Sequence, residues 1–213
     1  MKVSPAKETI LKKIRQALSN PVPVPFPHSE GTDSVFTPAK QELEVLFAEN
    51  FSLLEGRFSF CFNEAELVEQ LQALIKARKW TKLYSREPII KNKLEQQGFN
   101  QVYTDDVKTC DASITGCEQL VARTGSIVMS AAQPSGRTVS VYAPVHICIA
   151  YTNQLVYDIK EALQNVKEKY PQLPSLITLA TGPSRTADIE KTLVVGVHGP
   201  KEVFCFLVES PQA

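Results

Sequence analysis

The densest group of side chains that could do chemistry follows a predicted buried strand, LITLATG, at residues 176–182. Five residues there combine hydroxyl groups, an unhindered backbone and a guanidinium: Thr181, Gly182, Ser184, Arg185 and Thr186. Ligands of open α/β sheets bind at the carboxyl ends of strands, and a helix predicted to begin in TADIEK (186–191) would add free amide groups. The segment therefore predicts a site for a carboxylate or phosphate. A plain helix N-cap is the alternative interpretation.

Two residues in other loops could complete this anion site. Arg137 lies in the turn PSGR, and a guanidinium can bind a carboxylate with two hydrogen bonds. His198 lies in GVHGP, where the glycines allow a tight bend. Each residue also fits an ordinary turn without a ligand. The glycine-rich fingerprints of nucleoside-triphosphate, dinucleotide and serine-hydrolase sites are absent from the sequence.

Glu118 is a weak candidate for a catalytic residue. It follows Cys117 directly after a predicted strand, and a carboxylate there could act as a nucleophile or a general base. A solvated carboxylate in a turn is the more common role of such a residue. The catalytic residues are otherwise unknown from the sequence.

The cysteines predict neither a metal site nor a disulfide framework. Several lie in apolar runs such as FSFCF and VHICIA, where a thiol behaves as a small hydrophobic group. Their spacing matches no zinc or iron–sulfur pattern. Free thiols fit a reducing cytoplasm, and we expect no cofactor in this chain. The five are Cys61, Cys110, Cys117, Cys148 and Cys205.

The charge balance argues against a dedicated nucleic-acid-binding protein. The 213 residues include 23 Lys and Arg and 23 Asp and Glu, so the formal net charge is zero. A chain of this length with 43% hydrophobic residues can bury a sizeable core. No apolar run approaches the roughly 20 residues that span a bilayer, and no secretory signal is evident. We expect a cytoplasmic protein without a membrane span.

The elements that must position these side chains fall into three parts. Residues 1–19 predict a basic amphipathic helix, with Ile10 and Ile14 on its apolar side. Residues 20–38 hold five prolines and predict an extended linker. Residues 39–213 form the α/β domain. The arm could pack on its own domain, on a sister subunit, on a partner or on a membrane surface.

Within the domain, helices and strands alternate up to residue 105, which is typical of βαβ units around a parallel sheet. Asn63 and Glu66 predict a capping box for the helix that follows them. Four strand-like segments in succession then favour antiparallel or mixed pairing: ASITG, GSIVMSA, TVSVYAP and VHICIAY. A long helix over residues 153–170 and a final strand pair, TLVVGVHGP with KEVFCFLVE, complete the pattern. The predicted fold is a three-layer α/β domain with a mixed, mostly parallel sheet.

Three segments resemble the lactate-utilisation protein C family, whose members carry a LUD domain. They are TGCEQLVARTGSIVMS (115–130), the PSGR turn before TVSVYAPVHICIA, and TGPSRTADIEKTLVVGVHGP (181–200). The resemblance implies a fold like that of the NagB/RpiA/CoA-transferase group. It also implies one subunit of a three-protein bacterial system that oxidises L-lactate to pyruvate, with iron–sulfur clusters in the partner proteins. It supplies no catalytic residues.

Two main functions from different classes remain open, besides a purely structural adaptor that uses the basic N-terminal helix. The first is a non-redox subunit of that iron–sulfur complex, with an anion-binding pocket at the carboxyl ends of strands. The alternative is a free-standing enzyme like NagB or a CoA-transferase, which would act on a phosphosugar, a folate-like molecule or an acyl-CoA. The expected partners are iron–sulfur proteins and an anionic small molecule, and the sequence is compatible with a homo-oligomer.

Overall fold

The computed structural model describes residues 5–19, 41–187 and 192–210. The chain separates into two units, residues 1–38 and residues 39–213. In the first unit, helix α1 (Pro5–Leu18) has no buried residue, and the side chains of Ile10 and Ile14 are exposed. The predicted linker lies outside the described residues. The bounds of arm, linker and domain stay predictions.

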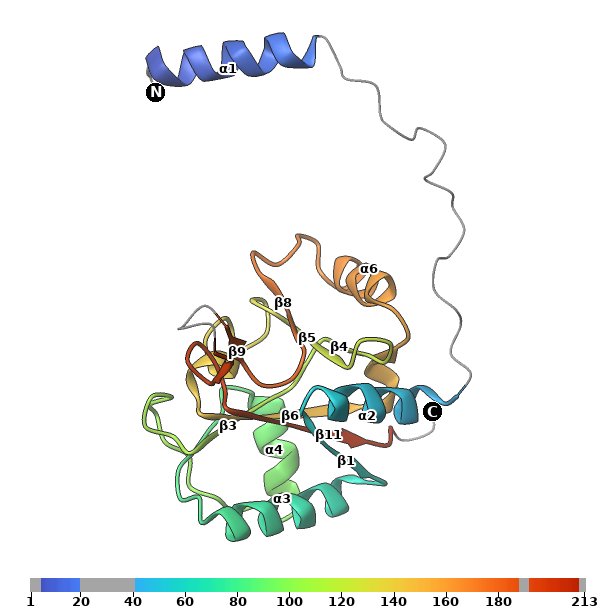
Figure 1. Cartoon of the computed structure of the whole chain (residues 1–213). Helices are drawn as coiled ribbons and strands as arrows, with labels where there is room; N and C mark the ends of the chain where they lie inside the picture. The colour runs from blue at the N-terminus through green and yellow to red at the C-terminus, as the bar shows by residue number, and fades with distance from the viewer. Residues whose placement is uncertain (1–4, 20–40, 188–191, 211–213) are drawn as a thin grey trace. The chain divides into compact units, whose positions relative to one another are not determined.

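A five-stranded parallel sheet forms the centre of the second unit (Figure 1). Every neighbouring pair in this central sheet is parallel, so the carboxyl ends of all five strands lie at one edge. The strands, in spatial order, are β1 (Arg57–Cys61), β11 (Glu202–Val208), β6 (Val145–Tyr151), β3 (Ala112–Thr115) and β2 (Leu83–Tyr84). Strand β11 is near the end of the sequence, but it lies between β1 and β6, which come much earlier in the sequence.

Alternate side chains of β11 enter two hydrophobic cores. Phe204 and Phe206 pack in the core that contains helices α3 (Glu64–Arg78) and α4 (Pro88–Gln96). Cys205 points to the opposite core, which contains helix α2 (Leu43–Leu53). This alternation follows the two-residue period of a strand. The central sheet is therefore covered on both faces, as parallel sheets generally are (Figure 1).

A second sheet lies on the α2 side of the central sheet. It has mixed pairing and the order β7 (Leu155–Val156), β4 (Gln119–Val121), β5 (Ser126–Ser130), β8 (Ile177–Ala180). Helix α6 (Ile159–Lys169) covers it, with Ala162 and Val166 packed on Val121 and Val128. The predicted mixed α/β fold with a mostly parallel central sheet is confirmed.

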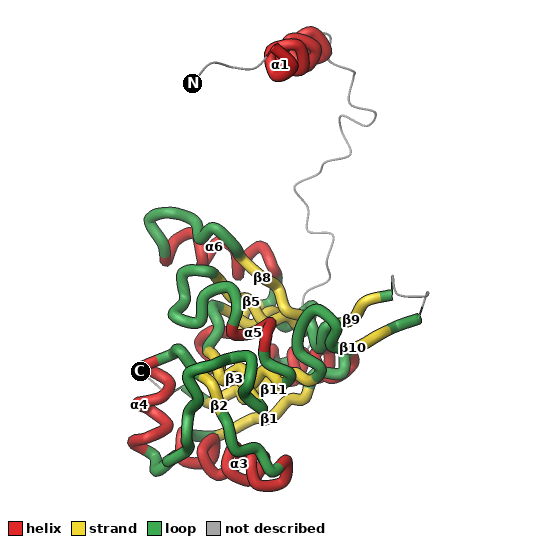
Figure 2. The backbone as a smooth tube through the Cα atoms, turned by 90° about the vertical axis from the view of Figure 1, so that its left-hand side faces the viewer, coloured by secondary structure: helices red, strands yellow, loops and turns green. Residues whose placement is uncertain are grey.

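Antiparallel pairing is confined, within the described residues, to the second sheet and a small hairpin. The hairpin consists of β9 (Arg185–Thr186) and β10 (Val194–Val195), and it projects from the body of the domain (Figure 2). The predicted pairing of the last two strand segments is wrong, because β10 pairs with β9 while β11 lies between β1 and β6. Long-range pairing of this kind leaves no local sequence signal.

Three further local predictions are wrong. The segment TVSVYAP contains helix α5 (Val139–Tyr142), whose turn forms because the carbonyl of Thr138 accepts hydrogen bonds from two following amides. The helix predicted from residue 153 begins only at Ile159, since Asp158 caps it and the preceding residues form a 3-10 turn (Thr152–Gln154) and then β7. QVYTD contributes an isolated bridge at Tyr103 and no strand.

The predicted cap of α3 is confirmed in part. Asn63 Oδ1 accepts a hydrogen bond from the amide of Glu66 at 2.9 Å. The Glu66 carboxylate accepts from the amide of Phe62 instead of returning to Asn63. Both bonds satisfy amide groups at or next to the helix start, which would otherwise lack partners.

His146 is a fully buried histidine at the centre of the sheet. Its side chain is 1% exposed, and Nε2 lies 2.8 Å from Thr115 Oγ1. Burial lowers the pKa of His146 to about 4, because a charged imidazolium would lose its hydration.

Stability should therefore fall in acid partly through His146. Below pH 6.5 the unfolded chain binds a proton that the folded chain excludes until about pH 4. The contribution of neutral, buried His146 to the free energy of unfolding is complete above pH 6.5, and about 3 kcal/mol of it is lost by pH 4. We expect urea unfolding of His146→Gln to show a flatter pH dependence than the wild type over this interval. The exposed control His198→Gln should keep the wild-type slope, and parallel profiles for all three proteins would contradict the assignment.

Candidate functional site

A cavity of about 760 Å³ lies at the carboxyl edge of the central sheet. Its wall includes Gly116 after β3, Tyr151 at the end of β6, and the first residues of α4. The end of α6 contributes Lys169 and the following residue Tyr170. In open α/β proteins this edge is where ligands bind. The cavity also falls within the size range typical of small-molecule sites.

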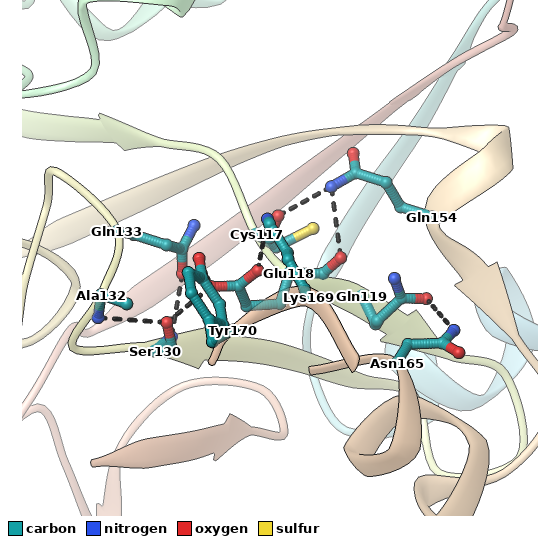
Figure 3. Close-up of polar contacts among 10 residues, drawn as sticks. All are labelled: Cys117, Glu118, Gln119, Ser130, Ala132, Gln133, Gln154, Asn165, Lys169 and Tyr170. Atoms are coloured by element: carbon teal, nitrogen blue, oxygen red, sulfur yellow. Dashed lines mark hydrogen bonds and ion pairs between the residues drawn. The ribbon is translucent and has the colours of Figure 1, made fainter. Parts of the chain in front are cut away.

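Glu118 is a buried carboxylate held by three donors next to this cavity (Figure 3). Its Oε1 accepts hydrogen bonds from Ser130 Oγ at 2.5 Å and from Tyr170 Oη at 2.8 Å. Its Oε2 accepts from Lys169 Nζ at 2.7 Å. The side chain is only 1% exposed, and a buried carboxylate is tolerated when it is paired and hydrogen-bonded in this way.

Glu118 contributes to a raised pKa in both Lys169 and Tyr170. Partial burial lowers the pKa of Lys169, but the hydrogen bond and charge of Glu118 outweigh this effect, so the net pKa is raised. Burial raises the pKa of Tyr170, and the same carboxylate raises it further. Lys169 and Tyr170 are therefore donors at neutral pH on the cavity wall. Glu118 acts through them as a positioning residue, because both of its oxygens are occupied and it does not itself line the cavity.

A second Glu–Lys–Tyr cluster lies on the same cavity. Lys93 Nζ is 2.9 Å from Tyr151 Oη and 3.0 Å from Glu64 Oε1, and the tyrosine hydroxyl donates to the same carboxylate oxygen at 2.9 Å. Burial lowers the pKa of Lys93, but its hydrogen bonds and the Glu64 charge raise it overall. The three residues come from the start of α3, from α4 and from the end of β6. The cavity wall thus carries a lysine and a tyrosine from each cluster, with Glu64 also on the wall and Glu118 outside the lining.

Sequence reasoning missed the two lysines and two tyrosines of this site. Tyr151 is the last residue of a strand, and Tyr170 follows the last residue of a helix. Their places at the ends of these elements are the only feature of the sequence that points to a site. Lys93 is indistinguishable in sequence from a solvated helix residue. Glu118 was singled out, but its buried partners depend on tertiary contacts.

Arg185 belongs to β9, and its side chain contacts the end of helix α2. Its guanidinium donates to the carbonyl oxygen of Leu54, the C-cap of α2, and lies 3.7 Å from Glu55 Oε2. A helix C-terminus carries partial negative charge, so the guanidinium contacts a negative group of the protein itself. The helix predicted to begin at Thr186 is wrong at its start, because residues 185–186 form an antiparallel strand; residues 188–191 lie outside the described part.

Gly182 approaches the C-cap of α2 closely, and its neighbour Thr181 bonds to the second sheet. Gly182 has a φ of +83°, and a Cβ there would collide with the carbonyl oxygen of Leu54. Thr181 Oγ1 is 2.9 Å from Ser126 Oγ, which in turn is 2.8 Å from Thr124 Oγ1. The three hydroxyl groups connect the start of β5 to the residue that follows β8, and Gly182 next to Thr181 lies close to the C-cap of α2.

The remaining predicted ligand residues do not share one cavity. The backbone of Ser184 pairs with Gly196 and Pro200, which brings these two family segments together. His198 lines a different cavity, of about 610 Å³, near the amino ends of the central strands. Arg137 donates to Ser175 Oγ at 2.5 Å. A ligand role for Thr181, Gly182, Ser184, Arg185, Thr186, His198 and Arg137 stays a prediction.

The five cysteines are free and buried. Burial raises the pKa of Cys61 to about 12 and that of Cys110 to about 11, which disfavours the thiolate form. Within the described residues, no group of three or more His, Cys, Asp or Glu side chains is arranged to hold a metal ion.

Comparison with known proteins identifies the family of this chain. Residues 82–208 match the model of the LUD domain. The chain belongs to the LUD domain family. This confirms the predicted membership, and the matched region contains Lys93, Glu118, Tyr151, Lys169 and Tyr170.

Curated relatives of this LUD domain protein include proteins named lactate utilization protein C. The protein from Anoxybacillus flavithermus is 31% identical over 157 residues, which cover 65% of this chain and 68% of the relative. The protein from Bacillus licheniformis is 36% identical over 99 residues, 45% of this chain and 41% of the relative. An uncharacterized protein of Neisseria meningitidis serogroup B is 33% identical over 47% of this chain and 43% of its own length. The matched segments thus span less than half of the last two relatives.

A solved structure supports the fold. A DUF162 family protein from Deinococcus radiodurans superposes with a TM-score of 0.58 at 18% identity, over 81% of this chain and 99% of the other. None of the helices in the described part of the LUD domain protein is long and apolar enough to cross a membrane.

The contact between Gly182 and α2 predicts an unusually costly glycine substitution. Gly182 and Gly98 have φ values of +83° and +81°, but a Cβ at Gly98 would meet nothing within 4 Å. Gly98→Ala should cost about 1 kcal/mol through backbone strain alone. Gly182→Ala should cost about 2 kcal/mol more, because its methyl group displaces Leu54. Equal losses of unfolding free energy in urea for Gly98→Ala and Gly182→Ala would show that the close approach of Gly182 to Leu54 does not matter for stability.

Proposed function

We propose that this LUD domain protein is a subunit of a bacterial system that oxidises L-lactate to pyruvate. The observation that carries the proposal is the likeness to proteins named lactate utilization protein C, which extends over 68% of the Anoxybacillus flavithermus relative. The LUD domain match includes the residues that line the cavity at the carboxyl edge of the sheet, except Glu64 and Ser210. The chain would contribute a binding site to this system.

In this proposal the electrons pass through iron–sulfur partner proteins. The state of the cysteines supports this division of labour. All five thiols are buried, and Cys148 and Cys205 pack within the hydrophobic core beneath α2. Iron–sulfur clusters are held by convergent thiolates, whereas burial raises the pKa of Cys61 and Cys110 and so disfavours their thiolate forms.

A free-standing enzyme is the second candidate function. The observation that favours it is the pair of Glu–Lys–Tyr clusters on one cavity, since these side chains can act as general acids and bases. The geometry disfavours Glu118 as its nucleophile, because the side chain is 1% exposed and accepts three hydrogen bonds. Such an enzyme would turn over a phosphosugar, folate-like molecule or acyl-CoA without any partner.

Removing the chain from its host should abolish L-lactate oxidation while sparing pyruvate use. In extracts of the deletion strain we expect L-lactate-dependent reduction of an artificial electron acceptor to fall at least tenfold. Adding back the purified full chain should restore both acceptor reduction and pyruvate formation, since the partners are still present. The purified chain alone should form no pyruvate.

Undiminished lactate oxidation in the deletion extract would contradict the proposal. Turnover of an acyl-CoA or phosphosugar by the purified chain, together with normal lactate oxidation in that extract, would support the second candidate instead.

A further inference from the structure

Glu87 is a buried carboxylate with an unused oxygen on the wall of the 760 Å³ cavity. It directly precedes α4 and is 7% exposed. Its Oε1 accepts a hydrogen bond from Ser135 Oγ at 2.5 Å. No group of the described residues donates to Oε2, and no described lysine or arginine forms an ion pair with this side chain. Oε2 is therefore accessible from the cavity, where a ligand that brings a hydrogen-bond donor can contact it.

The two lysines of the cavity have hydrogen-bond donors without acceptors, whereas Glu87 has an acceptor without a donor. An ammonium group carries three N–H donors. Lys93 uses two of them, on Tyr151 and Glu64, and Lys169 uses two, on Glu118 and Tyr170. Both lysines line the cavity, and each keeps a spare donor. They favour a ligand group that accepts hydrogen bonds and carries negative charge.

The charges of the wall do not favour a simple anion. Lys93, Lys169, Glu64 and Glu87 all line the cavity, and Glu118 accepts a hydrogen bond from Lys169 without lining it. The positive charge of each lysine is already matched by its own glutamate at 3.0 Å or less. A ligand with one negative group would gain from a lysine but would be repelled by Glu87. A ligand with both signs of charge satisfies both sets of groups.

We propose that this cavity binds a zwitterionic small molecule, an α-amino acid, with its ammonium group on Glu87 and its carboxylate on Lys93 or Lys169. Ile90 and Ile149 also line the cavity, so the wall offers apolar surface for the side chain of the ligand. The inference is independent of the lactate-utilisation role. Amino-acid binding is measured on the purified chain, whereas that role is measured in extracts.

The test compares each proteinogenic amino acid with the 2-oxo acid of the same side chain, using the full chain. Thermal unfolding at 10 mM ligand identifies binders, and isothermal titration calorimetry gives their dissociation constants. At least one amino acid should raise the Tm, because it binds only the folded state. Its 2-oxo acid should bind at least tenfold more weakly, since it retains the carboxylate and lacks the ammonium group.

Glu87→Gln should weaken amino-acid binding at least tenfold, because it removes the charge while keeping the shape. Glu95→Gln is the control: Glu95 lies within α4, is exposed and is absent from the cavity wall, so this variant should bind like the wild type. The inference is overturned if no amino acid raises the Tm, if the 2-oxo acids bind equally well or better, or if folded Glu87→Gln keeps wild-type affinity. Should Glu87→Gln not fold, the comparison of the two ligand classes on the wild type decides the question.

Discussion

The arrangement of the cavity depends on one buried negative charge, the carboxylate of Glu118. Taking a carboxylate out of water is favourable only when donors surround it, and here they come from the end of β5 and the end of α6. Satisfying Glu118 therefore fixes the end of α6 against the second sheet at the carboxyl edge of the central sheet. The same contacts leave Lys169 and Tyr170 protonated on the cavity wall.

Much of the fold could be predicted from local patterns. The continuous apolar runs VHICIAY and KEVFCFLVE form β6 and β11, and the amphipathic segment after Asn63 forms α3. The insertion of β11 between β1 and β6 could not be predicted, because strand partners are chosen by long-range packing. The segment TVSVYAP could not be predicted either. Its β-branched residues favour a strand, but they form the short helix α5.

The candidate site was less predictable than the fold. The group around Arg185 was recognised as a concentration of donors, and its guanidinium does contact negative charge, in the form of the last turn of α2. The cavity residues Lys93, Tyr151 and Lys169 lie far apart in the sequence, on elements whose ends meet only in the folded domain. Each resembles a surface residue when taken alone. Their proximity is a property of the topology.

The most direct measurement of this account is a double-mutant cycle between Glu118 and Lys169. The free energy of unfolding in urea is compared for the wild type, Glu118→Gln, Lys169→Met and the double variant. If the buried carboxylate organises the cavity wall, the two substitutions should be coupled by at least about 1 kcal/mol, with the double variant less damaged than the sum of the single variants. Additivity within about 0.5 kcal/mol would contradict the account.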